Sequence, residues 1–102
     1  MTDGLEILDR LYFRTPARKR AVEKARLNAE IAQEIYALRT KAGLTQAQLA
    51  KLVGTTGSVI SRLEDADYSG HSLSMLQRVS AALNRRLEIR FVPLAVRRRK
   101  TA

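Results

Sequence analysis

The chain has 102 residues, of which 45% are hydrophobic, 28% are charged and 5% are aromatic, and it contains neither Trp nor Cys. Its length suits one domain and excludes two of ordinary size, and the lack of Cys excludes disulfides, thiolate metal sites and cysteine nucleophiles. A formal net charge of +9 favours a polyanionic partner, of which nucleic acid is the commonest in a cytoplasm. The N-terminus lacks a signal-peptide pattern and no apolar run is long enough to span a membrane, so we expect a cytoplasmic protein without a membrane partner.

Basic residues gather in three runs, at 18–20, 85–86 and 97–100, whereas residues 1–14 carry a slight acidic excess. Such runs can neutralise phosphates, and each neutralised phosphate steepens the dependence of binding on salt. A charge block at a chain end is as often only solvated, so the sequence leaves both interpretations of 97–100 open.

A long helical segment is expected first. Thr15 is a suitable N-cap, Pro16 is a suitable first helical residue, and no Gly or Pro interrupts the chain from there to Ala42. Gly43 provides the C-terminal stop. The pattern fits one long helix as well as two helices that meet near Asn28.

Three shorter helices follow, at about 46–53, 56–64 and 73–83, and a loop of turn residues covers 65–70. Each helix follows a hydroxyl side chain that can cap its N-terminus: Thr45 for the first, Thr55 or Thr56 for the second, and Ser72 for the third. The apolar residues that recur at helical spacing form the expected core: Leu49, Ala50, Val53, Val59, Ile60, Leu63, Leu73, Leu76, Val79 and Leu83.

After the last helix the hydrophobic pattern changes its period. Apolar and charged side chains alternate along Leu87–Phe91, which predicts a half-buried β-strand that ends before a proline. One strand is not stable alone, and the other candidate strand, at residues 5–8, fits a short helix equally well. The simplest solution is that the strand pairs with its copy in a second chain.

This segment is complementary to itself in the antiparallel direction. Pairing centred on Ile89 sets Glu88 of one chain opposite Arg90 of the other, twice. It also sets Leu87 opposite Phe91. Such cross-strand pairs each contribute roughly 0.2–1 kcal/mol. We therefore expect a homodimer.

The stretch TQAQLAKLVGTTGSVISRLE, residues 45–64, places two short amphipathic helices on either side of a tight turn. Its residue types suit a helix-turn-helix, since Ala50 is small where the second helix crosses the first and Gly54 can adopt the positive φ of the turn. Ile60 and Leu63 hold the second helix against the core in this arrangement. The opposite face of that helix is then free to enter a major groove of DNA.

Residues 36–83 resemble the Xre/Cro-type helix-turn-helix family, which includes the lambdoid phage repressors. The resemblance is carried by the LTQ that opens the motif, the small Ala50, the VGTT at the turn and the ISRLE at its end. It implies a partly buried ion pair between Arg39 and Glu64. The role of that pair is structural, because breaking a buried ion pair is costly even where the pair itself adds little.

Nearly the whole chain also resembles antitoxins of the HigA type and their orphan relatives, in which a helical segment precedes the motif and a strand like LEIRFVP follows it. The implied fold is mainly α, a lambda-repressor-like bundle with a helical extension (1–34), a helix-turn-helix domain (35–84), a dimerising strand (85–94) and a basic tail (95–102). The implied function is that of a dimeric, often autoregulatory operator-binding protein that can also neutralise a ribonuclease toxin of the HigB/RelE type.

Candidate DNA contacts follow from docking geometry, because the N-terminal part of the second motif helix reads bases and the N-terminus of the first sits on phosphate. Gln46 is then the expected phosphate contact, while Lys51 and Thr55 approach the DNA backbone, with Arg78 as a weaker candidate. Arg62 either contacts a guanine with two hydrogen bonds, worth roughly 1–3 kcal/mol of discrimination, or clamps a phosphate. The other residues expected on this face are small or hydroxylic: Thr56, Gly57, Ser58 and Ser61.

Gly57 departs from the family, many of whose members carry a Gln for base readout at this position. A Gly cannot read a base edge, so we expect weak direct readout, with specificity that depends on dimer spacing, DNA shape and phosphate contacts. The alternative is a chain that has lost operator recognition and keeps only a protein partner.

No pattern points to catalysis, a metal or a cofactor. The only His, His71, stands at an expected helix start, and Asp65 and Asp67 share one loop without the further ligand spacing of an EF-hand. We therefore expect a protein that is not an enzyme. Three functions stay open: an autorepressing DNA-binding antitoxin, a toxin-binding module that uses residues 1–34 and has vestigial DNA binding, and a freestanding Xre-type regulator.

Overall fold

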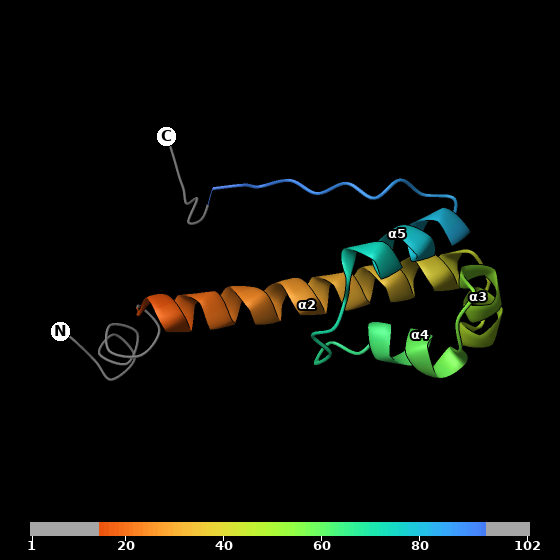
Figure 1. Cartoon of the computed structure of the whole chain (residues 1–102), viewed down its shortest axis with the longest axis horizontal. Coiled ribbons are helices and arrows are strands. Elements are labelled where there is room, and N and C mark those ends of the chain that lie inside the picture. The colour runs from red at the N-terminus through yellow and green to blue at the C-terminus, as the bar shows by residue number, and fades with distance from the viewer. Residues whose placement is uncertain (1–14, 94–102) are drawn as a thin grey trace.

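The computed structural model describes residues 15–93, whose arrangement is shown in Figure 1. Within these residues the chain forms four helices and no strand: α2 (Pro16–Lys41), α3 (Gln46–Val53), α4 (Gly57–Leu63) and α5 (Leu73–Ala82). The long helix α2 forms a rod, and the other three helices gather around its C-terminal half (Figure 1). After α5 the chain runs extended, back along the length of α2 (Figure 1). None of the helices in this part of the chain is long and apolar enough to cross a membrane.

The N-terminal end of α2 follows from local chemistry. The Thr15 hydroxyl accepts a hydrogen bond from the N–H of Arg18 at 3.2 Å, and Pro16 occupies a position where its missing N–H removes no helical hydrogen bond. The helix then continues through residue 28 without a break. The single-helix alternative is therefore confirmed. Ala42 closes the helix, and Gly43 follows with a positive φ of 74°.

The short helices are capped by hydroxyl side chains, as expected. Thr45 and Gln48 form a capping box at the start of α3, in which each side chain accepts a hydrogen bond from the backbone N–H of the other, at 3.0 and 2.8 Å. The cap of α4 is Thr56 and not Thr55, since the Thr56 hydroxyl accepts a hydrogen bond from the N–H three residues further on, at 3.3 Å. Ser72 caps α5 in the same way.

The hydrophobic core lies where α3, α4 and α5 meet the C-terminal half of α2. Its buried apolar residues come from all four helices: Ile35, Leu49, Ala50, Val53, Ile60, Leu63 and Val79. Removing a Leu, Ile or Val side chain from water contributes about 1.5–3 kcal/mol, so this cluster is the main source of stability for the bundle. The first half of α2 adds nothing to it, because no residue from 15 to 30 is buried.

The strand predicted at Leu87–Phe91 is absent from the single chain. Residues 86–93 are extended, but their backbone groups form no hydrogen bond with any other part of residues 15–93. The physical reason is that a strand exists only as one side of a ladder, and the described part of the chain offers it no second side. The alternative partner at residues 5–8, like the basic tail at 95–102, lies outside the described residues.

Candidate nucleic-acid interface

The two faces of α4 differ sharply in exposure. Ile60 and Leu63 point inward and are 0% and 2% exposed, so they fix the helix against the core. Three residues on the other face are exposed to solvent: Ser58, Ser61 and Arg62. A helix of this kind, packed across α3 with a polar outer face, has the geometry that enters a major groove.

The turn between α3 and α4 is held from two sides. Gly54 adopts a left-handed conformation with φ of 84°, and the N–H groups of Gly54 and Thr55 both donate to the Ala50 carbonyl, at 2.8 and 2.9 Å. From α5, the Arg78 guanidinium donates to the Val53 carbonyl at 2.9 Å and to the Gly54 carbonyl at 3.1 Å. This cation therefore ties α5 to the C-terminal end of α3, where the helix dipole is negative.

The sequence made Arg78 a weaker candidate for a contact to the DNA backbone and gave no sign of a role within the protein. Its guanidinium bonds to two carbonyls of the turn. No local pattern could have revealed this, because the residues in contact are 24 and 25 positions apart in the chain.

Behind the interface lies an ion pair that joins α2 to the end of α4. Arg39 Nε lies 2.6 Å from Glu64 Oε2, and Arg39 Nη2 lies 3.0 Å from Glu64 Oε1. The two side chains are only 11% and 4% exposed, and a further guanidinium N–H donates to the Leu44 carbonyl at 2.8 Å. The hydrogen bonds that Arg39 donates to the Glu64 carboxylate raise the pKa of Arg39, although burial acts in the opposite direction. Arg39 is therefore charged throughout the physiological pH range.

Gln46, the first residue of α3, is part of the same network. Its amide Nε2 donates to Glu64 Oε1 at 3.1 Å, and its side chain is only partly exposed. The expected contact of this amide with phosphate would therefore compete with a bond inside the protein. Arg39 of α2 and Gln46 of α3 both donate to the carboxylate of Glu64, the residue that ends α4. Glu64 therefore sets the relative positions of these three helices.

The remaining residues predicted at the interface lie on or beside the same two helices. Lys51 is exposed in the last turn of α3, and Thr55 is half-buried in the turn. Thr56 is exposed, but its hydroxyl serves as the cap of α4. Gly57 is the first residue of α4, and a Cβ built there would come no closer than 3.9 Å to Ala47. A side chain therefore fits at position 57, and packing does not require a Gly.

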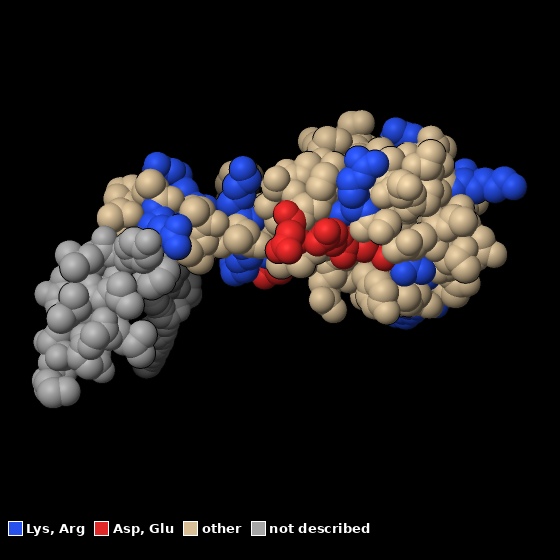
Figure 2. Space-filling model, turned by 90° about the horizontal axis from the view of Figure 1, so that it is seen from below, with Lys and Arg blue, Asp and Glu red and all other residues tan. Residues whose placement is uncertain are grey.

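The face of the molecule seen from the α4 side carries charges of both signs. Figure 2 shows Asp and Glu side chains gathered near the middle of this face, with Lys and Arg on both sides of them. Carboxylates repel phosphates, so a duplex on this side would be held by the flanking cations. On this face of the molecule the Lys and Arg side chains thus form separate groups and not one continuous basic stripe (Figure 2).

A family model described as helix-turn-helix (HTH_3) matches residues 35–89, just over half of the chain. No curated protein and no solved structure gave a match. The matched region contains the C-terminal part of α2 together with α3, α4 and α5, which is the bundle described above. The chain thus belongs to the HTH_3 helix-turn-helix family, a family of DNA-binding regulators.

Proposed function

We propose that this protein is a dimeric, sequence-specific transcriptional regulator of the cytoplasm that reads an operator with α4. The observation that carries the proposal is the outer face of α4, where Ser58, Ser61 and Arg62 are exposed while the inner face is locked into the core. The network around Glu64 and the clamp on the turn by Arg78 support it, because both hold α4 rigidly relative to α3.

Each residue of the interface has a role in this proposal. Arg62 is the one side chain on the outer face of α4 that can bond a guanine twice, and the two serines can bond either kind of base. Gln46, Lys51 and Thr55 contact the DNA backbone and set the register of the protein on the duplex. Because Gly57 cannot contribute to readout, the spacing of two half-sites supplies much of the specificity.

The dimer of the proposal forms through the extended segment after α5. Its backbone groups, which bond to no other part of residues 15–93, and the opposite charges of Glu88 and Arg90 on either side of Ile89 support antiparallel pairing of two copies. Charge reversal tests the register. Glu88→Arg and Arg90→Glu should each weaken self-association, whereas a mixture of the two variants should form heterodimers, since every opposed pair is then complementary. Equal self-association of both variants and the native chain would contradict this register.

The same protein is proposed to act as an autorepressing antitoxin that binds a ribonuclease toxin of the HigB/RelE type. The observation that favours this partner is the N-terminal half of α2, which projects beyond the core and leaves Val22 and Leu27 48% and 52% exposed. The bundle does not need this half-helix for its own stability. A protein partner is a physical reason for keeping apolar residues there.

One experiment separates the three functions named above. The untagged protein is recovered from its native cytoplasm, bound proteins are identified by mass spectrometry, and bound DNA is sequenced. We expect a small ribonuclease together with DNA from the promoter of the protein itself. DNA from scattered promoters without a protein partner would make the protein a freestanding regulator. A protein partner without specific DNA would contradict the operator proposal.

A matched pair of variants then tests the role of α4. Arg62→Ala should weaken binding to the recovered operator by about 5- to 150-fold, as expected for the loss of a bidentate guanine contact. It should leave binding to unrelated DNA nearly unchanged. An equal loss on both DNAs would instead assign Arg62 to a phosphate.

A further inference from the structure

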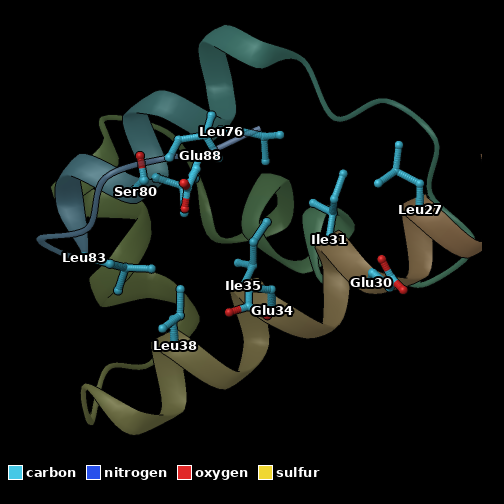
Figure 3. Close-up of a pocket in the computed structure, with 12 residues that line it drawn as sticks. Leu27, Glu30, Ile31, Glu34, Ile35, Leu38, Leu76, Ser80, Leu83 and Glu88 are labelled. Carbon is cyan, nitrogen blue, oxygen red and sulfur yellow. The ribbon is translucent and has the colours of Figure 1, made fainter. Parts of the chain in front are cut away.

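A groove with an apolar floor runs between α2, α5 and the start of the extended segment. It encloses about 270 Å³, and its apolar lining comes from α2, from α5 and its C-cap residue, and from the extended segment: Leu27, Ile31, Ile35, Leu38, Leu76, Val79, Leu83 and Leu87. Figure 3 shows the side chains of α2 facing those of α5 across this space, with Ser80 and Glu88 at its edge. No residue of α3 or α4 lines the groove, so an occupant would leave the outer face of α4 free.

The charges that line this groove are all negative. Glu30, Glu34 and Glu88 contribute to its lining, whereas no Lys or Arg does so. That is unexpected in a chain with 19 basic and 10 acidic residues. The Glu30 carboxylate forms an ion pair with Arg26. The carboxylates of Glu34 and Glu88 form no hydrogen bond or ion pair with another residue among 15–93. The groove therefore fits an occupant that is apolar and carries a positive charge.

The extended segment has this chemistry, but it does not fill the groove of its own chain. Phe91 is 97% exposed, more than any other large apolar side chain in residues 15–93, and Arg90 precedes it. Glu88 is the last residue of the segment that lines the groove, so Phe91 lies beyond it. Arg90, Val92 and Pro93 instead line a second groove, of about 510 Å³, against the N-terminal half of α2, and Phe91 lines neither of the two.

The geometry points to a second copy of this chain as the occupant, with Phe91 of each copy seated in the groove of the other. In antiparallel pairing centred on Ile89, Phe91 of one copy stands opposite Leu87 of the next, and opposed residues project from the same face of a ladder. Leu87 lines the groove, so the incoming Phe91 is directed into it. Arg90 of the same copy stands opposite Glu88 on the other face of the ladder, so this charge pair fixes the register while Phe91 enters the groove.

This arrangement rests on the dimer of the proposed function and adds the contact that stabilises it. Backbone pairing of two short segments is weak alone, because a two-stranded ribbon is marginal in water. Two Phe side chains, each moved from nearly full exposure into an apolar groove, supply the missing burial. Because the dimer has two-fold symmetry, each Phe91 enters an equivalent groove on the other copy.

Site-directed cross-linking tests the arrangement directly, because the native chain has no Cys. Full-length Ser80→Cys and Phe91→Cys variants are mixed and oxidised, so that only a contact between copies can join them. We expect a covalent dimer from this mixture. The matched control replaces Ser80→Cys with Leu73→Cys, which is on the same helix and 54% exposed but does not line the groove. No covalent dimer is expected from the control mixture.

Self-association of point variants gives a second measurement. Phe91→Ala should raise the dissociation constant of the dimer by about 100-fold or more in sedimentation experiments, since two buried aromatic side chains are lost per dimer. Leu73→Ala should change it by less than about threefold. Because Phe91 contacts no core residue, the circular dichroism spectrum of the Phe91→Ala monomer should match that of the native chain.

The outcomes separate this inference from the proposed function. A chain that stays monomeric, or a dimer without the cross-link between positions 80 and 91, would overturn the inference. Protection of the Ser80→Cys thiol from alkylation by a co-purified protein partner, and not by a second copy, would also overturn it. A cross-linked dimer that binds no operator would contradict the proposed function and leave this inference standing.

Discussion

The helix-turn-helix bundle buries most of its apolar side chains, whereas the parts that project from it leave theirs exposed. In the bundle the inner residues of each helix are buried, its turn is held by an Arg, and its one buried ion pair is bonded on both oxygens of Glu64. The N-terminal half of α2 and the segment at 86–93 bury almost nothing, although both carry apolar residues. The bundle is complete in one chain. The projecting parts leave their apolar side chains, such as Leu27 and Phe91, exposed to solvent.

The largest expected contrast between these two regions comes from their ion pairs. Glu64→Ala should lower the free energy of unfolding by about 3–5 kcal/mol, because it leaves the charge of Arg39 buried without a carboxylate to balance it. Glu30→Ala removes an exposed partner of Arg26 on the projecting half-helix and should cost less than about 1 kcal/mol. Urea unfolding measures both losses. Equal losses would mean that the buried pair behaves like an exposed one.

Arg39 should make little contribution to the pH dependence of stability near neutral pH. The pKa of Arg39 is raised in the folded state above an ordinary value that is already high. Its stabilisation is therefore fully present below that ordinary value and is lost only as the pH rises through the folded-state pKa, in strongly alkaline solution. The stability difference between native chain and Glu64→Ala should show no step at an Arg39 titration anywhere between pH 6 and about pH 9.

The next contrast concerns apolar side chains. Ile60→Ala should lower the free energy of unfolding by about 2–5 kcal/mol, since Ile60 is fully buried and its removal leaves a cavity. Val22→Ala should cause no loss, because Val22 is half exposed and Ala is the better helix former. Thermal unfolding at low protein concentration checks both variants. A marked loss for Val22→Ala would show that the projecting half-helix supports the fold of the monomer.

A smaller effect is expected where α5 holds the turn. Arg78→Lys should cost about 1 kcal/mol of stability, because the ammonium of the shorter Lys side chain does not reach the position of Arg78 Nη2, which donates to both carbonyls. It keeps the positive charge, so the number of phosphates neutralised on DNA should not change. The salt dependence of operator binding measures that number. A reduced slope with unchanged stability would assign Arg78 to DNA and not to the turn.

The smallest effect on stability is expected at the start of α4. Gly57→Ala should stabilise the protein by up to about 0.5 kcal/mol, since a Cβ meets no atom closer than 3.9 Å and the backbone loses less entropy on folding. Gly57→Gln adds a side chain that can bond an adenine, so it should change the preferred operator sequence. Selection of bound sequences from a random pool tests this. Identical preferences would show that position 57 does not reach the bases.

Much of the bundle could be predicted from residues that act locally. Thr15, Thr45 and Ser72 are helix caps, and Gly54 has the positive φ expected at the turn. Most of the apolar residues at helical spacing proved to be buried or half-buried, although Leu73 is 54% exposed. These features depend on neighbours within about four positions, and such interactions can be recognised from the order of residues alone.

The extended segment and the network around the turn could not be predicted in this way. The alternating pattern at Leu87–Phe91 indicates a strand, but a ladder needs a second strand, and residues 15–93 contain none. Gln46 lies at the expected helix start, yet its amide is bonded to Glu64, 18 residues further along the chain. In both cases the outcome depends on what lies opposite the residue in space.

The sequence by itself therefore determined where the helices begin and end, which of their faces are apolar, and that a helix-turn-helix with a small, hydroxylic outer face is present. Only the tertiary structure decided that α2 is too long for the bundle it supports, that Arg78 holds the turn, and that an apolar groove with three Glu side chains in its lining forms between α2 and α5 while Phe91 is left uncovered. The physical reason is how far apart along the chain the interacting residues lie. Caps, turns and helical periodicity are set within one or two turns of chain, whereas grooves and bridging cations arise from residues that the fold brings together across most of its length.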